Sequence, residues 1–192
     1  MPKWQKLNRQ RKNNMETIFV EGFYGAGHKM IAKLLASRKN LKYIDMEDAI
    51  CDKEKASKDN IINEKGIDYY LNVEKYILKN AIEQGSIVSL DEIMIENEDI
   101  RHIIKRTGRV FYLKASPELL YNNLCNMPHN IKILQNDFSI LTIKKMLEVY
   151  EKYYYELQNY IINIDGKNID TMLKETLAIY NYLHKIKCHI YM

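Results

Sequence analysis

The fold of this chain is decided by the stretch Phe19-Val20-Glu21-Gly22-Phe23-Tyr24-Gly25-Ala26-Gly27-His28-Lys29-Met30. Its apolar beginning predicts a buried strand, and its three glycines predict a tight turn that leads into a helix. Such a turn can direct several backbone N–H groups at one point, and the first turn of the helix adds its own unpaired N–H groups. The stretch therefore predicts a cradle for a phosphate group at the end of a strand.

The glycine spacing fits the P-loop motif, but the residues after the last glycine do not. The motif reads G-x-x-x-x-G-K-[ST], in which the lysine reaches the terminal phosphates and the hydroxyl binds Mg²⁺. Gly22 and Gly27 stand at the glycine positions, whereas His28 replaces the lysine and Lys29 the hydroxyl residue. His28 is short and at most partly charged near pH 7, and Lys29 is rotated by about 100° around the helix from the lysine position. The cradle is kept without its usual charge and metal ligand.

Composition predicts one domain over residues 15–192. The chain has 192 residues, 46% of them hydrophobic, which is enough for one sizeable core. Residues 1–14 hold five of the positive charges and no acid, so the net charge of +4 leaves 4 − 5 = −1 for the remainder. We expect these residues to form a solvated, weakly ordered tail; a nucleic-acid arm or a docking helix around Trp4 and Leu7 are the alternatives. For the domain itself no nucleic-acid partner is expected.

Cysteine use and hydropathy indicate a cellular compartment. Cys51, Cys125 and Cys188 are widely spaced and odd in number, which favours a reducing environment and argues against a disulfide framework or a zinc site. No segment approaches the ~18 consecutive apolar residues of a membrane-spanning helix. We therefore expect a cytoplasmic protein without a membrane partner.

Hydrophobic patterning predicts a parallel sheet covered by helices. Apolar runs without alternation predict buried strands at 17–20, 41–44, 86–90, 109–113 and 160–164. Helical periodicity predicts helices at 29–37, 68–84, 99–106, 116–124, 140–155 and 170–183. The alternation of the two predicts an α/β fold of three layers. Ligands in such folds bind beyond the carboxyl ends of the strands, where the glycine turn, Asp45 and Asp91 should converge.

Four segments resemble the shikimate kinase family, which comprises small P-loop kinases of the nucleoside-monophosphate-kinase type. Residues 22–27 resemble its G-F-M-G-A-G turn, and residues 43–47 resemble its strand that ends in D-x-D. Residues 62–66 and 70–74 resemble its stretch ending in F-R-x-x-E, and residues 110–118 its fourth-strand signature. The resemblance extends from about residue 15 to the C-terminus. It implies a P-loop kinase fold with small substrate-domain and lid segments, at 46–84 and 127–137, that move as flaps. It also implies ATP and Mg²⁺ as cofactors and shikimate as the acceptor.

The acceptor site implied by the resemblance is altered. Leu71 stands where the family has an arginine for the shikimate carboxylate, and Asp91-Glu92-Ile93 replaces a G-G-G segment. A second arginine falls on Tyr150 or Glu151, depending on register. An anionic acceptor would lose both arginines and meet two like charges, so recognition of shikimate is predicted to be lost.

Other positions keep the type of residue that the family has. By the resemblance, Asp45 and Glu47 serve a metal and the substrate hydroxyl, with Asp45 as the candidate metal ligand; on sequence alone a pair of solvated acids at a strand end fits equally. Residues 87–92 also resemble a Walker B strand, in which Asp91 would organise Mg²⁺, although acids often cap strands or start helices. Candidate catalytic residues are therefore Asp45, Glu47 and Asp91. Candidate nucleotide-binding residues are Gly22, Gly25, Ala26, Gly27, His28, Lys29, Met30 and Lys132, the last in place of a lid arginine.

Three hypotheses follow. The favoured one is a protein of the shikimate kinase fold that has lost phosphoryl transfer and binds a nucleotide, a phosphate or a protein partner. The second is a divergent ATP-dependent small-molecule kinase in which the acids take over metal and base duties. The third is an authentic but atypical shikimate kinase that converts ATP and shikimate to ADP and shikimate 3-phosphate. The first is favoured because the positive charge that usually stabilises the transferred phosphate is missing.

Overall fold

The computed structural model describes residues 16–83, 85–126 and 137–190, and the side chains of Glu83 and of residues 186–190 are excluded from that description. The basic segment 1–14, nearly all of the expected lid at 127–137, and Lys132 lie outside the described residues. The expectations made for them therefore stay predictions.

The described part of the chain contains a five-stranded parallel sheet, as predicted. Its strands are β1 (Thr17–Glu21), β2 (Tyr43–Asp45), β3 (Ile87–Ser89), β4 (Gly108–Lys114) and β5 (Tyr160–Asn163). They lie in the order β2-β3-β1-β4-β5, and each neighbouring pair is parallel. In the central strand, Phe19 lies opposite Val88 on one side and Val110 on the other. Every residue of β1 is buried, as its unbroken apolar run predicted for a strand covered on both faces.

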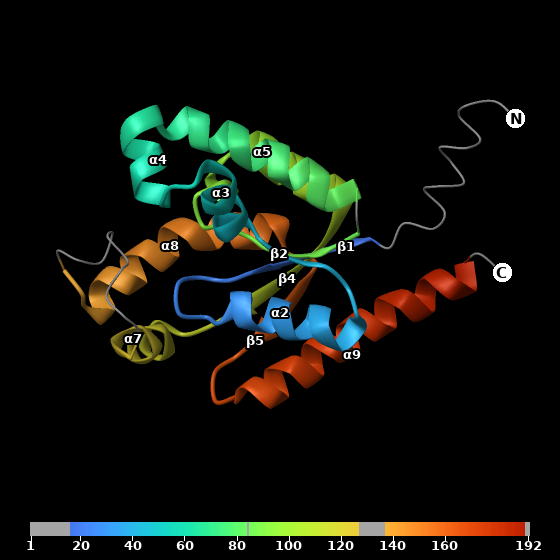
Figure 1. The fold of residues 1–192 in the computed structure, drawn as a ribbon. Coiled ribbons are helices and arrows are strands. Elements are labelled where there is room, and N and C mark those ends of the chain that lie inside the picture. Colours follow the sequence, from blue (N-terminus) through green and yellow to red (C-terminus); the bar gives the residue numbers. More distant parts are fainter. Residues whose placement is uncertain (1–15, 84, 127–136, 191–192) are drawn as a thin grey trace, which may run out of the picture.

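Helices cover both faces of the sheet and complete the three layers. Figure 1 shows α2 (His28–Lys39) and α9 (Ile169–Ile190) on one side, and α5 (Ile67–Glu83) and α8 (Ile140–Leu157) on the other. The remaining described helices are α3 (Met46–Glu54), α4 (Lys58–Lys65), α6 (Glu98–Thr107), α7 (Pro117–Cys125) and the short 3₁₀ helix η1 (Met94–Glu96). All six predicted helices are confirmed. Helices α3 and α4 were not predicted, because each is short and carries a weak apolar pattern.

Side-chain caps fix where the two unpredicted helices begin. The carboxylate of Asp45 accepts a hydrogen bond from the backbone N–H of Asp48 at 3.1 Å, and the hydroxyl of Ser57 accepts one from Asn60 at 3.3 Å. Such caps satisfy N–H groups that the first turn leaves without an intrahelical partner. The polypeptide therefore turns from β2 directly into a helix, so Asp45 has a structural role at the end of its strand.

Two apolar clusters organise the described residues. The larger one surrounds the sheet, and the smaller one joins α3, α4 and α5 through Ile50, Ile61, Tyr70 and Val73. Helix α5 contributes to both clusters, because Leu78 and Ala81 belong to the larger one. Helices α3 to α5 thus pack around a small core of their own, as the expected substrate-domain segment requires; whether it moves stays a prediction.

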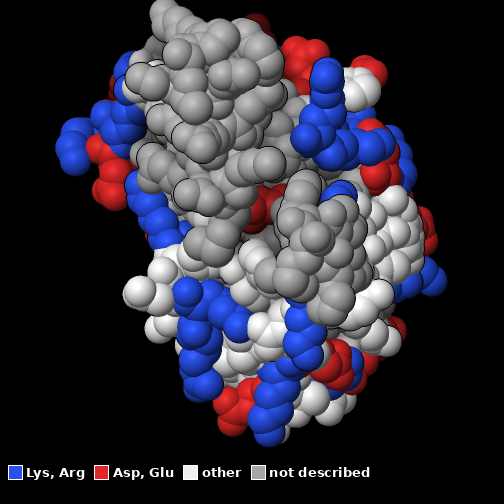
Figure 2. Space-filling model, turned by 90° about the vertical axis from the view of Figure 1, so that its right-hand side faces the viewer, with Lys and Arg blue, Asp and Glu red and all other residues white. Residues whose placement is uncertain are grey.

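The described surface carries mixed charge. Among the described residues on the face shown in Figure 2, Lys and Arg side chains lie beside Asp and Glu side chains, and neither sign covers the face alone. No helix within the described part of the chain is both long enough and apolar enough to cross a membrane.

Candidate functional site

The glycine turn between β1 and α2 needs its glycines. Gly25 and Gly27 have φ angles of +83° and +77°, in the left-handed region that side chains with a Cβ disfavour. A Cβ on Gly22 would lie 2.9 Å from the Cβ of Ala26 and 3.0 Å from the carbonyl oxygen of Leu113. The side-chain amide of Asn123 donates to the carbonyl oxygen of Gly25 at 2.9 Å, which ties the turn to α7. The predicted cradle is therefore a tightly packed turn.

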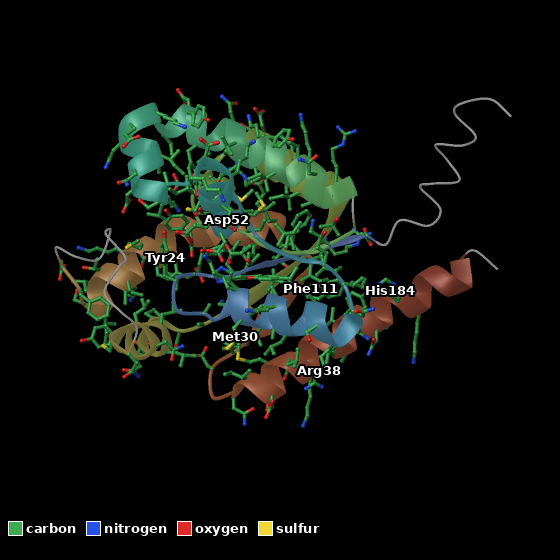
Figure 3. The ribbon with its side chains drawn as sticks, in the orientation of Figure 1. Tyr24, Met30, Arg38, Asp52, Phe111 and His184 are labelled. Atoms are coloured by element: carbon green, nitrogen blue, oxygen red, sulfur yellow. The ribbon has the colours of Figure 1, made fainter. Side chains whose placement is uncertain are left out.

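Helix α2 starts at this turn without a side-chain cap. Gly27 is the N-cap residue, and the described residues provide neither a capping hydrogen bond there nor an acidic side chain in the first turn. The helix thus presents the positive end of its dipole and N–H groups that no side chain satisfies, which is the arrangement that favours an anion. Met30, one of the predicted nucleotide-binding residues, is largely exposed and projects from α2 on the side away from the sheet (Figure 3).

His28 contributes no positive charge to the turn. Its side chain is only 4% exposed. Burial, with a further contribution from the charge of Lys29, lowers the pKa of His28 to about 4, so the imidazole is neutral at pH 7. The ring lies against the backbone of Leu90, but neither nitrogen makes a well-formed hydrogen bond to any described residue. The residue at the usual lysine position is therefore a buried, neutral side chain.

Lys29 extends from α2 to the acids of the second strand and its following helix. Its ammonium nitrogen lies 2.8 Å from Oε2 of Glu47 and 3.4 Å from Oδ1 of Asp45. Partial burial disfavours the ammonium, but the hydrogen bond to Glu47 and the charges of both carboxylates outweigh it and raise the pKa of Lys29. The charge that replaces the hydroxyl residue of the motif is therefore already paired within the chain.

The carboxylate of Asp45 already has several partners within the chain. Its carboxylate accepts hydrogen bonds from the hydroxyls of Tyr43 and Ser89, each at 3.2 Å, and caps α3. Lys29 brings a positive charge to the same carboxylate. Mg²⁺ bound to a nucleotide takes one or two protein carboxylates beside phosphate and water oxygens, so an ion at Asp45 would have to displace the ammonium of Lys29. Asp45 is placed to cap a helix and pair with a lysine.

Asp91 lies at the carboxyl end of β3 and is fully paired. Its oxygens are 2.6 and 2.8 Å from the ammonium of Lys58, and Oδ2 also accepts a hydrogen bond from the hydroxyl of Tyr70 at 2.8 Å. The backbone N–H of Ile93 donates to Oδ1 at 3.1 Å. The Asp91 side chain has no exposed area, whereas that of Lys58 is 17% exposed. Sequence reasoning missed Lys58, because one lysine among many gives no signal of a partner 33 residues away.

The predicted pair of like charges at Asp91 and Glu92 is not what the structure shows. Asp91 is neutralised by Lys58. Glu92 is buried, and burial together with the charge of Asp91 raises the pKa of Glu92, which favours the neutral form of its carboxyl group. The repulsion of an anionic acceptor by two negative charges is therefore weaker than the sequence suggests, because Lys58 pairs with Asp91 and burial favours the neutral form of Glu92.

Two positions lack the arginines that the resemblance implies, and neither carries a positive charge. Leu71 is half-buried against the larger apolar cluster. Tyr150 is buried, its hydroxyl donates to Oε1 of Glu96 at 2.6 Å, and its ring centroid lies 6.0 Å from that of Phe23. Glu151 instead faces Lys114, at 3.9 Å between its Oε1 and the ammonium, so the inward-facing residue of the two is Tyr150. Neither Leu71 nor Tyr150 can form an ion pair with a carboxylate.

Two further residues join this region. Tyr24, from the turn itself (Figure 3), is close enough to Glu92, Asp91 and Tyr150 to interact with them electrostatically. Glu74 is completely buried without a hydrogen-bond partner among the described residues. Burial and the charge of Asp91 raise the pKa of Glu74 to about 9. The sequence pointed to Glu74 through its position in the F-R-x-x-E resemblance. It gave no indication that the carboxyl group of Glu74 lacks a hydrogen-bond partner among the described residues.

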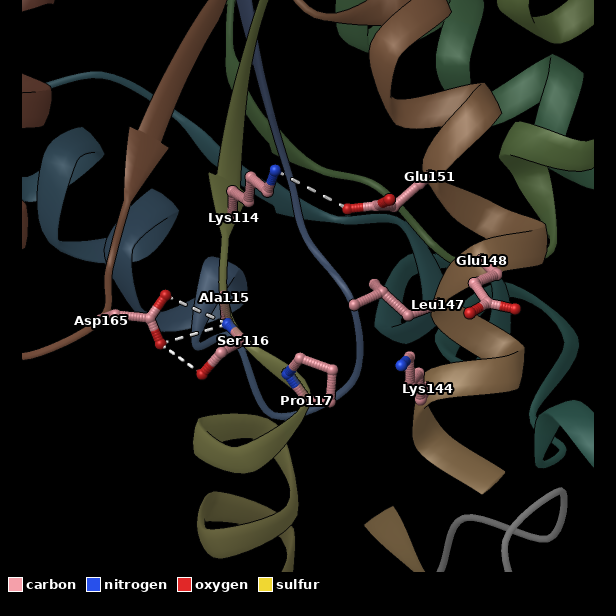
Figure 4. A pocket seen from close by; sticks show the side chains of 9 residues that line it. All are labelled: Lys114, Ala115, Ser116, Pro117, Lys144, Leu147, Glu148, Glu151 and Asp165. Atoms are coloured by element: carbon pink, nitrogen blue, oxygen red, sulfur yellow. Dashed lines mark hydrogen bonds and ion pairs between the residues drawn. The ribbon is translucent and has the colours of Figure 1, made fainter. Parts of the chain in front are cut away.

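The described residues also form a pocket of about 350 Å³ (Figure 4). It opens between the end of β4, the start of α7 and one face of α8, and the loop after β5 closes it through Asp165. Asp165 accepts hydrogen bonds from the backbone N–H of Ser116, at 3.1 Å, and from its hydroxyl, at 2.5 Å. Of the residues lining it, Glu151 alone was named individually in the sequence analysis, as the alternative position of the second arginine. The lining residues are Lys114, Ala115, Ser116, Pro117, Lys144, Leu147, Glu148, Glu151 and Asp165.

Comparison with known proteins gives one family. The family model described as shikimate kinase matches residues 24–181. A shikimate kinase of Sulfurihydrogenibium sp. (strain YO3AOP1) is 28% identical over 167 residues, which cover 85% of this chain and 97% of the relative. A shikimate kinase of Chlorobium limicola is 34% identical over 110 residues, covering 57% of this chain and 55% of the relative.

Solved structures show the same fold. The shikimate kinase from Bacteroides thetaiotaomicron superposes with a TM-score of 0.77 at 23% identity, covering 88% of this chain and 99% of that one. The shikimate kinase from Acinetobacter baumannii, solved in complex with shikimate, gives a TM-score of 0.74 at 20% identity and covers 93% and 98% of the two chains. The predicted P-loop kinase fold is confirmed.

Proposed function

Because the chain belongs to the shikimate kinase family, we propose that it is a member that has lost phosphoryl transfer and acts by binding the phosphates of a nucleotide. The phosphates would bind at the glycine turn, without a requirement for Mg²⁺. The observation that carries the proposal is the pairing of Lys29 with Asp45 and Glu47, which puts a lysine ammonium at the carboxylates that a metal would need.

The loss of catalysis is argued from charge. Phosphoryl transfer depends on positive groups that stabilise the transferred phosphate, mainly a lysine and a metal ion. His28 is neutral and buried, and the ammonium of Lys29 is held by two carboxylates. Asp91, the other candidate metal ligand, has both oxygens bonded to Lys58. Within the described residues, the groups that would hold ATP and Mg²⁺ in a reactive geometry are therefore absent or engaged.

The retention of binding is argued from the backbone. Gly22, Gly25 and Gly27 keep the turn in a conformation that side chains would disturb, and α2 begins there without a side-chain cap. N–H groups and a helix dipole bind phosphate without any lysine. The alternative is that the chain binds a protein partner instead of a nucleotide.

A divergent ATP-dependent kinase is the second candidate, and one observation favours it. Lys29 is the cation of the described structure that lies next to both the turn and Asp45. If a bound nucleotide drew the ammonium of Lys29 away from Glu47, Lys29 would supply positive charge to a phosphate from a position one residue beyond that of the usual lysine. That kinase would then have to act on an acceptor other than shikimate, since Leu71 and Tyr150 offer no charge to a carboxylate.

Calorimetric titration with ATP and ADP, each with and without Mg²⁺, tests the proposal. We expect both nucleotides to bind, with affinities that change by less than about threefold when Mg²⁺ is added. Lys29→Met should leave the affinity as little changed as Lys33→Met, which replaces an exposed lysine of the same helix; a loss of affinity confined to Lys29→Met would favour the kinase. A coupled assay with shikimate should show no ADP formation. Binding that rises more than about tenfold with Mg²⁺ and collapses in Asp91→Asn would overturn the proposal in favour of the kinase.

A further inference from the structure

The carboxylate of Asp91 is bound in the way that a receptor binds a ligand. Among the described residues, groups from three parts of the chain donate to it: the ammonium of Lys58 from α4, the hydroxyl of Tyr70 from α5, and the backbone N–H of Ile93 from the loop after β3. Lys58 contacts both oxygens, at 2.6 and 2.8 Å. The ammonium also lies 5.7 Å from the ring centroid of Tyr70, so the two donors are positioned together.

Local turn geometry explains only one of these bonds. An aspartate often accepts a hydrogen bond from the N–H two residues further on, and the bond from Ile93 is of that kind. The bonds from Lys58 and Tyr70 join residues 33 and 21 positions apart in the sequence. Burying a lysine and a carboxylate removes both from water, and this cost is offset only by good geometry and further hydrogen bonds. Both conditions are met here.

The position of this arrangement ties it to the candidate site. Asp91 follows β3 at the carboxyl edge of the sheet, and its charge acts on Tyr24 of the glycine turn and on Tyr150 of α8. Glu74, on the same helix as Tyr70, is buried nearby without a hydrogen-bond partner in the described residues, and both Asp91 and Lys58 influence its titration. The paired carboxylate thus lies beside the phosphate cradle, at an edge where acceptors bind in folds of this type.

We propose that Lys58, the hydroxyl of Tyr70 and the N–H of Ile93 form a carboxylate-binding site in which the chain's own Asp91 is the resident ligand. Asp91 occupies the site and thereby excludes an external carboxylate. Electrostatic repulsion between Asp91 and that carboxylate contributes little, because Lys58 neutralises Asp91. Removing the Asp91 side chain vacates the site and leaves a lysine and a hydroxyl that can bind a small carboxylate. This inference does not depend on nucleotide binding, so its failure would leave the proposed function standing.

Thermal unfolding in sodium acetate, compared with sodium chloride at equal ionic strength, tests the inference. In Asp91→Ala, acetate should raise the melting temperature in a saturable way, by about 3–6 °C at ten times the dissociation constant. The unaltered chain should show no difference between the two salts. The double variant Lys58→Met/Asp91→Ala should lose the response.

The matched control is Asp99→Ala. Asp99 also pairs with a lysine, Lys75, at 2.9 Å, but its side chain is 77% exposed. Its removal leaves no enclosed site, so acetate should have no specific effect. An equal response in Asp99→Ala and Asp91→Ala, or no response in a folded Asp91→Ala variant, would overturn the proposal.

A second measurement decides the case if Asp91→Ala does not fold. Asp91→Asn keeps the shape of the side chain but removes its charge, so Lys58 should become accessible to a small acylating reagent. Mass spectrometry should then show acylation of Lys58 about tenfold faster or more than in the unaltered chain, because a buried pair protects far better than an exposed one. In Asp99→Asn, acylation of Lys75 should change little. Equal rates for Lys58 in the two proteins would refute its role as a donor to Asp91.

Discussion

Replacing Lys58 with methionine should destabilise the protein strongly, and replacing its partner as well should restore most of the loss. Lys58→Met leaves the carboxylate of Asp91, whose side chain has no exposed area, without its counter-charge. Removing one partner of a buried ion pair costs about 3–5 kcal/mol. Because Lys58 keeps 17% of its side chain exposed, we expect a value near the lower limit, about 3 kcal/mol.

The double variant Lys58→Met/Asp91→Leu replaces the pair with apolar side chains of similar size. Such replacements are often neutral or stabilising, so its free energy of unfolding should lie within about 1 kcal/mol of the unaltered chain. The coupling energy between the two positions would then be about 2 kcal/mol or more. For a chain of this length, the single variant should melt about 6–12 °C lower.

Urea denaturation followed by circular dichroism measures these free energies, provided that the slope with denaturant stays constant among the variants. Lys75→Met is the matched control, since the Lys75–Asp99 pair is solvent-exposed and should contribute about 0–1 kcal/mol. The reasoning would be refuted if Lys58→Met cost no more than Lys75→Met. A double variant as unstable as the single one would equally refute it.

Three further predictions concern other parts of the site. Glu74 has a pKa of about 9 in the folded chain against an ordinary value of 4.5, so the folded state keeps a proton that the unfolded state loses, and the free energy of unfolding should fall as pH rises from about 5 to 9. Glu74→Gln should flatten this fall, measured by urea denaturation at several pH values; an unchanged pH dependence would contradict a buried, protonated Glu74. His28→Lys with Lys29→Ser should tighten ATP binding in calorimetry yet give no detectable shikimate phosphorylation, whereas clear turnover would show that the acceptor side has been misjudged. Gly25→Ala should weaken nucleotide binding and lower the free energy of unfolding by about 1–2 kcal/mol or more, since the φ angle of Gly25 is +83°. Gly66→Ala, at a φ angle of +84° with open space around it, should show the backbone strain without the loss of nucleotide binding.

Local patterns were sufficient for the fold. The apolar run of β1 and the glycines after it predicted a strand, a turn and a helix, and each glycine of the turn has a steric or conformational reason in the structure. The same patterns missed α3 and α4, because helices of nine and eight residues with few buried positions give a weak periodic signal. Their caps, Asp45 and Ser57, were the readable signals.

The chemistry of the site was less predictable, because it depends on contacts between distant segments. Helix geometry predicted that Lys29 does not take the lysine position of the motif, but gave no indication that Lys29 pairs with Asp45 and Glu47. The repulsion expected at Asp91 and Glu92 was overestimated for the same reason. A carboxylate in sequence carries a formal charge, whereas in the structure a lysine from another helix or burial from water decides whether that charge acts.

Two lysines of the chain form ion pairs with the carboxylates that a metal or an acceptor would contact. Lys29 pairs with Asp45 and Glu47, and Lys58 pairs with Asp91. A metal-dependent kinase needs carboxylates that stay ready for Mg²⁺, because the ion must displace whatever balances them before it can bind. Internal pairing makes that displacement costly, most of all at Asp91, where the pair is buried. Each of these carboxylates at the carboxyl edge of the sheet is thus already paired with a lysine, and this pairing, more than the altered motif alone, is the physical reason to expect nucleotide binding that does not depend on Mg²⁺.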